Sequence, residues 1–234
     1  MIRFSAHLSM LFADLPPVER PEAAHDEGFD LVESWWPEDE RFFTAVRRFG
    51  FELACLNAYG GDLSAGDRGF LNDPARREEA VAAVRAALAQ KPHVVNVLVG
   101  RELPDTPRAQ QLDHVVDVLR ELAELGGTLV VEPLNEHDVP GALLPTAADA
   151  VRLLERVGAE NVRLLYDAYH AARAGADPLV EAPALADVIG HVQYADCPGR
   201  GAPGTGTIDL DALVERLDAA GYEGAVGLEY HRVA

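Results

Sequence analysis

The stretch TLVVEPLN, Thr128 to Asn135, combines a buried strand with an acidic residue at its carboxyl end. The run LVV at 129–131 is short, apolar and rich in β-branched residues, a pattern typical of a strand that is buried on both faces. Glu132 ends the run, and Pro133 closes the strand to further pairing because proline has no N–H to donate. In parallel α/β folds, ligands bind at the carboxyl ends of the strands. The stretch therefore predicts a parallel sheet with a functional carboxylate at that end.

Strand-like and helix-like runs alternate along the whole chain. The predicted strands cover residues 2–5, 29–33, 51–56, 93–99, 129–131, 162–166, 189–194 and 225–229. The predicted helices cover residues 18–27, 38–49, 73–89, 106–125, 146–157 and 209–221, and one more helix ends over 184–188. Eight strands with intervening helices predict an α/β fold, the (β/α)8 TIM barrel, as a single domain over residues 1–234. Only five residues follow Glu229, so the final helix is predicted to be short or absent.

A doubly wound open sheet is the competing fold for the same alternation of strands and helices. That fold predicts a glycine-rich phosphate-binding turn directly after the first strand. The sequence there is SAHLSMLFADLPP, residues 5–17, which contains no glycine. The barrel is therefore favoured, and the missing dinucleotide motif predicts that no organic cofactor is needed.

The formal net charge of −19 limits the partners of this protein. Nucleic acids and anionic membranes are bound by clustered Lys and Arg, so the sequence predicts neither as a partner. The acidic balance suits a protein that gathers divalent cations, and an anionic substrate would need particular arginines to receive it. Lys91 is the only lysine and precedes Pro92 at the start of a strand, on the face away from the presumed site. This position excludes Schiff-base chemistry at the strand ends.

The sequence shows no secretion or membrane signal. No apolar window of about 18 residues is present, and polar residues interrupt the amino-terminal stretch. Cys55 and Cys197 form neither a zinc motif nor a disulfide framework, which suits a reducing compartment. We therefore expect a soluble cytoplasmic protein.

Four oxygen-bearing side chains follow the last four predicted strands: Glu132, Asp167, Gln193 and Glu229. For each residue alone, an isolated polar cap is the favoured interpretation, because loops at strand ends are polar. Their recurrence in consecutive β/α units instead favours a shared metal site. If Gln193 coordinates through its amide carbonyl, the donors are all oxygen, a set that prefers Mg²⁺ or Mn²⁺ over zinc or copper.

Two further residues lie close to these positions in the sequence. His170 follows Asp167 by three residues in YDAYH, so it can contact a bound substrate or orient the metal ligands, or it can cap the next helix. Arg200 lies in the loop 195–209, ADCPGRGAPGTGTID, whose glycines and prolines predict a shaped, exposed loop. Its guanidinium suits a carboxylate or phosphate, and the alternative is a surface ion pair.

Weaker candidates surround this set: Glu33, Asn57, His7, His191, Trp35, Trp36 and Cys197. Glu33 and Asn57 end predicted strands and either line the pocket or support other side chains. His7 is expected to form a pocket wall or to be a hydrogen-bonded polar residue of the core. His191 is expected to be a packed structural residue one layer deeper than Gln193. The two tryptophans form either an apolar lid over a small substrate or part of the core. Cys197 is expected to be a bystander.

Six segments together resemble the hydroxypyruvate isomerase family within the xylose-isomerase-like barrels. They are FSAHLSMLF at 4–12, GFDLVESWWP at 28–37, VVEPLN at 130–135, LLYDAYH at 164–170, HVQYADCPGRGAPGTGTID at 191–209 and GYEGAVGLEY at 221–230. VVEPLN and PGRGAPGTGTID are the most specific of them. The resemblance extends along nearly the whole chain and implies a (β/α) barrel.

The resemblance also implies roles for individual residues. A divalent cation would be held by Glu132, Asp167, Gln193 and Glu229. Of these, Glu132 and Glu229 would form the proton-transferring pair, and His170 and Arg200 would contact the substrate. His7 and Asn57 are the remaining predicted substrate contacts.

Aldose–ketose isomerisation fits these residues on chemical grounds as well. A proton leaves the carbon that carries a hydroxyl beside a carbonyl, a Lewis acid stabilises the resulting enediolate, and two carboxylates can remove and return the proton. With hydroxypyruvate, a small anion, the product is tartronate semialdehyde. Arg200 would hold the substrate carboxylate, and His170 would lie near the moving oxygen.

Two departures from the resembling sequences bear on these expectations. His7 stands where they usually show Asn, and the missing final helix leaves barrel closure and a homo-oligomeric assembly open. The rival functions are an isomerase or epimerase of another small sugar or sugar acid, such as 2-oxo-tetronate, and a catalytically silent metal or metabolite binder. A DNA-repair nuclease on a related barrel would need zinc-ligating histidines and a basic face, which this sequence lacks.

Overall fold

A computed structural model describes residues 2–37 and 39–232 and contains a closed barrel of parallel strands. Each strand pairs with the next along the chain, and β8 pairs with β1 to close the barrel. The strands are β1 Phe4–His7, β2 Leu31–Ser34, β3 Glu52–Asn57, β4 Val94–Asn96, β5 Thr128–Val131, β6 Val162–Asp167, β7 Ile189–Tyr194 and β8 Val226–Leu228. All eight predicted strands are present, so the predicted (β/α)8 barrel is confirmed.

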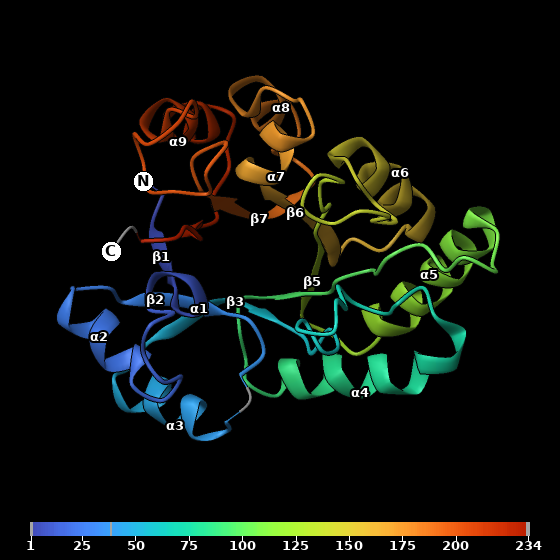
Figure 1. Cartoon of the computed structure of the whole chain (residues 1–234), viewed down its shortest axis with the longest axis horizontal. Helices are drawn as coiled ribbons and strands as arrows, with labels where there is room; N and C mark the ends of the chain where they lie inside the picture. The colour runs from blue at the N-terminus through green and yellow to red at the C-terminus, as the bar shows by residue number, and fades with distance from the viewer. Residues whose placement is uncertain (1, 38, 233–234) are drawn as a thin grey trace.

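Helices surround the strands, as Figure 1 shows. They are α1 Leu8–Leu11, α2 Arg20–Asp26, α3 Arg41–Arg48, the 3-10 turn η1 Pro74–Arg76, α4 Arg77–Leu88, α5 Arg108–Ala123, α6 Ala147–Val157, α7 Ala168–Arg173, α8 Pro178–Ala184 and α9 Leu210–Ala219. Residues 229–232, the described part of the chain after β8, contain no helix, in agreement with the prediction. No helix among the described residues is long and apolar enough to cross a membrane.

The helices cover the barrel with amphipathic faces. In α5 the fully buried residues Val115, Val118, Leu119 and Leu122 recur at the three- and four-residue spacing of one helix face. This spacing is what made the helix predictable from the sequence. The buried side chains of the strands and helices join in one large apolar core.

Two helical predictions need correction, and two short helices were not predicted. The segment 184–188 is not the end of a helix: α8 ends at Ala184, and turns follow it. This helix lies earlier in the chain because Asp177 caps it, its side chain accepting from the backbone N–H of Leu179. The predicted helix 38–49 begins only at Arg41, and Glu38 lies outside the described residues. Two short helices, α1 and α7, lie outside the predicted ones.

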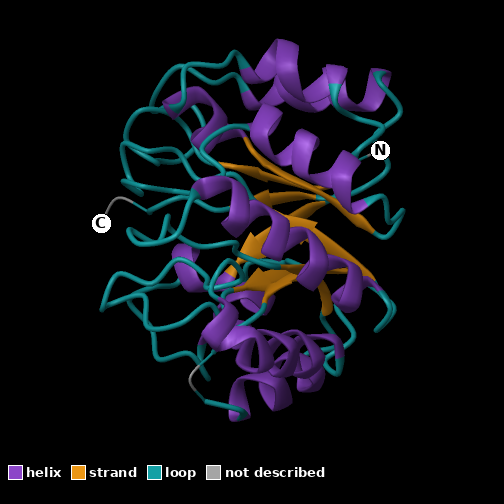
Figure 2. Cartoon of the chain, turned by 90° about the vertical axis from the view of Figure 1, so that its right-hand side faces the viewer, coloured by secondary structure: helices purple, strands orange, loops and turns teal. Residues whose placement is uncertain are grey.

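Long loops follow the strands, and short turns precede them. The segments 58–73, 97–107, 132–146 and 195–209 all follow the carboxyl end of a strand. Figure 2 shows the loops gathered mainly on one side of the barrel, with helices flanking the strands. In a TIM barrel this face carries the active site. The fold therefore places the segment after each strand where the candidate residues are expected.

Candidate active site

Four buried oxygen donors meet at the carboxyl face of the barrel. Glu132 directly follows β5, Asp167 ends β6, and Glu229 directly follows β8. Gln193 lies in β7, where it pairs with Asp167 on one side and with Gly227 on the other. Glu132 is 7% exposed and Gln193 only 1%, and the other two side chains are equally buried. The closed barrel thus gathers the four predicted residues in one buried cluster.

Asp167 uses its two carboxylate oxygens for different tasks. Oδ1 accepts hydrogen bonds from the backbone N–H groups of Tyr169 at 2.7 Å and His170 at 3.2 Å, and so caps α7. Oδ2 lies 3.6 Å from a guanidinium nitrogen of Arg200 and 3.8 Å from Nε2 of His170. The cap fixes the side chain so that its second oxygen faces the cluster.

Glu132 is held by one hydrogen bond in a crowded acidic environment. Asn96, at the end of β4, donates from Nδ2 to Oε2 of Glu132 at 2.7 Å. Burial raises the pKa of Glu132 well above its ordinary value, and the negative charges of Glu229 and Asp167 raise the pKa further. The Asn96 hydrogen bond and Arg200 act in the opposite direction. Burial and the neighbouring carboxylates therefore favour the protonated form of Glu132.

Glu229 accepts a hydrogen bond at one oxygen and faces a guanidinium group with the other. The indole Nε1–H of Trp35 donates to Oε1 at 3.2 Å, and Nε2 of His7 lies 3.5 Å from the same oxygen. A guanidinium nitrogen of Arg200 lies 3.2 Å from Oε2. Burial raises the pKa of Glu229, and the nearby Arg200 offsets part of that shift.

His170 presents a fixed N–H to the cluster. The backbone N–H of Asn135 points to Nδ1 of His170 at 3.2 Å, and the Asn135 side-chain amide lies 2.7 Å from the same atom. A backbone N–H can only donate, so Nδ1 accepts and the proton is on Nε2. Burial lowers the pKa of His170, which keeps the ring neutral. Nε2 faces Glu132 and Asp167 at 3.8 Å, and these three side chains lie close enough together to hold a metal ion. With its proton on Nε2, the ring instead offers a hydrogen-bond donor to the cluster.

Arg200 covers the acidic cluster from the loop after β7. Its side chain is 20% exposed, and its backbone adopts the left-handed conformation with φ 51°. The guanidinium carbon lies 5.1 Å from the centre of the Tyr169 ring, a cation–π contact. Arg200 is thus the cationic group closest to both Asp167 and Glu229, with a partly exposed side chain that an incoming anion can meet.

Two buried oxygens fit a divalent cation. Nε2 of Gln193 donates to Glu33 at 3.2 Å, whereas its Oε1 has no hydrogen-bond partner among the described residues. Oε2 of Glu229 likewise accepts no hydrogen bond from them. Buried polar atoms normally have a partner, and three clustered carboxylates repel one another. Glu132, Asp167, Gln193 and Glu229 offer the all-oxygen set that Mg²⁺ or Mn²⁺ prefers, so the residues fit such a cation.

The weaker candidates lie around this cluster. His7 is fully buried, and burial lowers its pKa to about 4, so it forms a neutral wall beside Glu229. Asn57 pairs with Asn96 in the sheet, one strand further from Glu132. Trp35 contacts the site, whereas Trp36 packs on Phe43 with ring centres 5.5 Å apart.

Two supporting residues, Asn96 and Asn135, were not among the predicted ones, and the contact between Trp35 and Glu229 was not predicted either. Asn96 interrupts the apolar run VVNVLVG, and a polar residue inside a buried strand is the signal that could have revealed it. Asn135 belongs to the VVEPLN segment, but its contact with His170 depends on how two loops meet. The bond from Trp35 to Glu229 joins residues from opposite ends of the chain, so local sequence offers no sign of it.

Known proteins resemble this chain over nearly its full length. The family model described as xylose isomerase-like TIM barrel matches residues 21–234. The chain is 39% identical to a putative hydroxypyruvate isomerase of Streptomyces coelicolor, covering 97% of this chain and 90% of the relative. It is 36% identical to the hydroxypyruvate isomerase of Escherichia coli (98% and 93%). It is 30% identical to a 2-oxo-tetronate isomerase of Cupriavidus necator (98% and 93%).

A solved structure has the same fold. The crystal structure of a family 2 AP endonuclease from Brucella melitensis matches with a TM-score of 0.93 and 29% identity, covering 100% of this chain and 95% of that chain. The family resemblance drawn from the six sequence segments is confirmed by these comparisons.

Proposed function

Because the chain belongs to the xylose isomerase-like TIM barrel family, we propose that it is a cation-dependent isomerase that converts hydroxypyruvate to tartronate semialdehyde. One observation carries the proposal: two buried glutamates with raised pKa values, Glu132 and Glu229, face one cluster from well-separated strands. Two such carboxyl groups suit removal and return of a proton on neighbouring carbons. Binding of a substrate without turnover would not need two carboxylates on either side of it.

The divalent cation would be held by Glu132, Asp167, Gln193 and Glu229. When bound, it would supply Lewis-acid stabilisation of negative charge that develops on the substrate oxygens. Mg²⁺ and Mn²⁺ both match the oxygen donors.

The residues of the chain account for the proton movements. In the forward direction one glutamate accepts a proton from the terminal carbon of hydroxypyruvate, and an enediolate forms. A proton is then delivered to the neighbouring carbon, which was the keto carbon, and the terminal oxygen becomes the aldehyde. The hydroxyl proton moves from the terminal oxygen to the central one, and Nε2–H of His170 would donate to these oxygens. Atoms and charge balance, because the reaction is an internal rearrangement.

Arg200 would receive the substrate carboxylate. Its guanidinium lies over the cluster next to Glu229, and a planar fork of donors binds a carboxylate through two parallel hydrogen bonds. The substrate would therefore lie between Arg200 and the buried donors. Trp35 and His7, on the opposite side of Glu229, would exclude water from the reacting carbons.

A second candidate substrate is 2-oxo-tetronate, the acid named for the Cupriavidus necator relative. The rearrangement would be the same on a chain one carbon longer. For the whole protein we also propose action in a reducing cytoplasm, supported by two free cysteines, and no nucleic acid partner, supported by the net charge of −19.

Proton exchange followed by NMR tests the proposal. The protein is incubated with hydroxypyruvate in deuterated water, with Mg²⁺ or Mn²⁺ and then with a chelator. We expect cation-dependent deuterium entry together with tartronate semialdehyde. Deuterium entry without that product would move the assignment to 2-oxo-tetronate or another sugar acid. Neither signal, from protein shown to bind the cation, would contradict an isomerase and favour a silent binder.

A further inference from the structure

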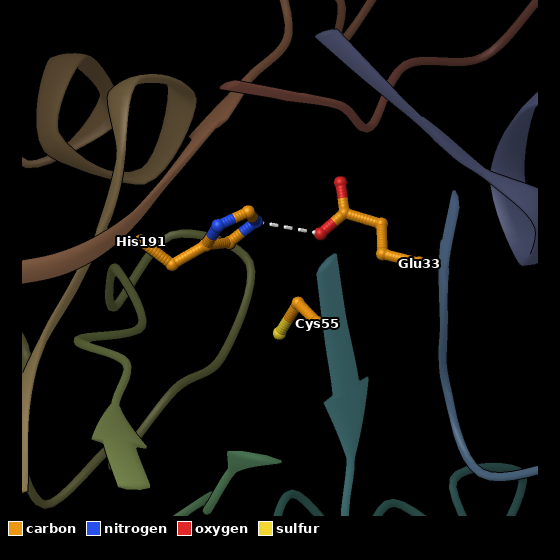
Figure 3. Close-up of side chains that lie close together, drawn as sticks. All are labelled: Glu33, Cys55 and His191. Atoms are coloured by element: carbon orange, nitrogen blue, oxygen red, sulfur yellow. Dashed lines mark hydrogen bonds and ion pairs between the residues drawn. The ribbon is translucent and has the colours of Figure 1, made fainter. Parts of the chain in front are cut away.

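A second buried group lies inside the barrel beside the candidate site. Figure 3 shows Glu33 and His191 pointing toward one another, with Cys55 beside them. Nε2 of His191 lies 2.8 Å from Oε2 of Glu33, and all three side chains are buried. Neither the proton transfers nor the cation ligands described above use these residues.

Oε2 of Glu33 is shared by two donors. Besides His191, the side-chain amide of Gln193 donates to it from Nε2 at 3.2 Å. A carboxylate accepts hydrogen bonds and donates none, whereas an amide has one donating and one accepting end. Glu33 therefore determines which end of Gln193 faces it. The amide NH₂ faces Glu33, and Oε1 is left without a hydrogen-bond partner among the described residues.

We propose that Glu33 is a positioning residue, which turns the amide of Gln193 so that its carbonyl oxygen faces the divalent cation. The inference rests on the cation of the proposed function. His191 holds Glu33 in place from the other side, so the order of contacts runs from His191 through Glu33 to Gln193. Groups that orient metal ligands typically contribute about 10- to 100-fold to metal affinity.

A glycine between the two residues leaves the space through which Glu33 reaches Gln193 inside the barrel. Glu33 projects from β2, and Gln193 from β7, with β1 and β8 between them. Ser5 of β1 pairs with Gly227 of β8, and Gly227 pairs on its other side with Gln193 of β7. A Cβ atom at Gly227 would overlap the Glu33 carboxyl group. The absent side chain leaves the space that Glu33 fills, and Ser5 Oγ donates to its Oε1 at 3.4 Å.

The same observations argue against a second metal site at this group. Glu33 and His191 are already hydrogen-bonded to one another, so each would have to give up its partner to bind an ion. Burial raises the pKa of Cys55 well above its ordinary value, and the charge of Glu33 adds to this shift. Cys55 is therefore a neutral thiol, which is not the form that binds metals.

A double-mutant cycle on Mn²⁺ affinity tests the proposal. Free Mn²⁺ is measured by EPR during titration of wild type, Glu33→Gln, Gln193→Met and the double variant, without substrate. When Gln193 is present, we expect Glu33→Gln to weaken Mn²⁺ binding about tenfold. A glutamine at position 33 can donate a hydrogen bond as well as accept one, so the amide of Gln193 is free to turn. In the Gln193→Met background we expect no further loss, since no amide remains to be positioned. The matched control is Glu181→Gln, the same change at a carboxylate that accepts from Tyr166 outside the site; its Mn²⁺ affinity should equal that of wild type.

The outcomes separate this inference from the proposed function. Unchanged affinity in Glu33→Gln, or equal losses in both backgrounds, would overturn the positioning role alone. Absence of Mn²⁺ binding by wild type would overturn the cation site and this inference with it. If Glu33→Gln does not fold, the ¹⁵N NMR signals of the Gln193 side chain in wild type decide. Amide protons that exchange slowly with solvent are expected from the bond to Glu33, and rapid exchange would contradict it.

Discussion

The side-chain amide of Asn96 donates a 2.7 Å hydrogen bond to Oε2 of Glu132, and this bond opposes the rise in the pKa of that glutamate. Oε1 is left to face His170. Asn96 thus fixes the carboxyl group in place and favours its ionised form. A glutamate that accepts a proton during catalysis must be both held in position and ionised.

We expect Asn96→Ala to lower kcat by about 10- to 100-fold and to shift the acid limb of the pH–rate profile upward. The hydrogen bond lowers the pKa of Glu132, so its loss raises that pKa, and a higher pH is then needed to ionise the base. The measurement is kcat against pH with saturating Mg²⁺. The control is Asn161→Ala, which removes an amide that donates to the backbone carbonyls of Ala123 and Gly127. An unmoved acid limb in Asn96→Ala would argue against Glu132 as the base.

We expect Glu229→Gln to abolish turnover, with kcat reduced at least about 1,000-fold, while the fold is kept. Glutamine keeps the shape of the side chain and can still accept from Trp35, but it cannot carry the proton. Turnover is followed by product NMR, and folding by circular dichroism. The exposed residue Glu215 offers a matched control, Glu215→Gln, with wild-type turnover. Near-normal activity of Glu229→Gln would exclude the two-carboxylate mechanism.

We expect Glu132→Gln to stabilise the protein in chelator, and more so near pH 8 than near pH 5. The folded-state pKa of Glu132 is raised, so this carboxyl favours folding most at low pH and loses that contribution as pH rises through the folded pKa. The affected window lies above the ordinary pKa of 4.5. Near pH 8, removing the charge should raise Tm by about 2–4 °C.

Scanning calorimetry at both pH values measures this effect. The wild type and the variant are compared in the same buffers, so titrations elsewhere in the protein cancel. With Mn²⁺ the wild type should have the higher Tm, because the variant has lost a cation ligand and is stabilised less by the ion. A variant that is less stable than wild type in chelator at pH 8 would count against carboxylate repulsion in this cluster.

We expect Arg200→Lys to raise KM for hydroxypyruvate by about 10-fold or more, because an ammonium group lacks the planar fork that binds a carboxylate through two bonds. Initial rates across a range of substrate concentrations give KM and kcat separately. Arg152→Lys, at an exposed ion pair with Asp149, is the control. An unchanged KM would place the substrate carboxylate elsewhere.

Local patterns were sufficient to predict the barrel and which acidic side chains meet at its carboxyl face. The strand at 129–131 is a continuous apolar run, and Glu132 directly after it shows where the carboxyl face lies. Residues far apart in sequence therefore became neighbours by the topology alone, as Glu132, Asp167 and Glu229 do. The short helix α7 was missed because its first turn depends on the cap from Asp167 rather than on an apolar period.

Contacts made inside the closed barrel could not be predicted from the sequence. Glu33 was expected only to line the pocket or to support other residues, and His191 only to pack. Their bond to one another, and that of Glu33 to Gln193, requires the empty space at Gly227, which appears only when the strands align. A glycine in a strand signals close approach of some group, but not which one.

Asp167 joins the start of a helix to the candidate site through a single side chain, and this affects how mutagenesis here should be read. Asp167→Ala would remove the cap of α7, move His170 and remove a cation donor at the same time. The effects of these three changes on activity could not be told apart. Asp167→Asn keeps an oxygen for the backbone N–H groups and changes mainly the charge. The first turn of α7 also becomes an internal sensor: amide exchange at Tyr169 and His170 should slow when a cation holds the other oxygen of the same carboxylate.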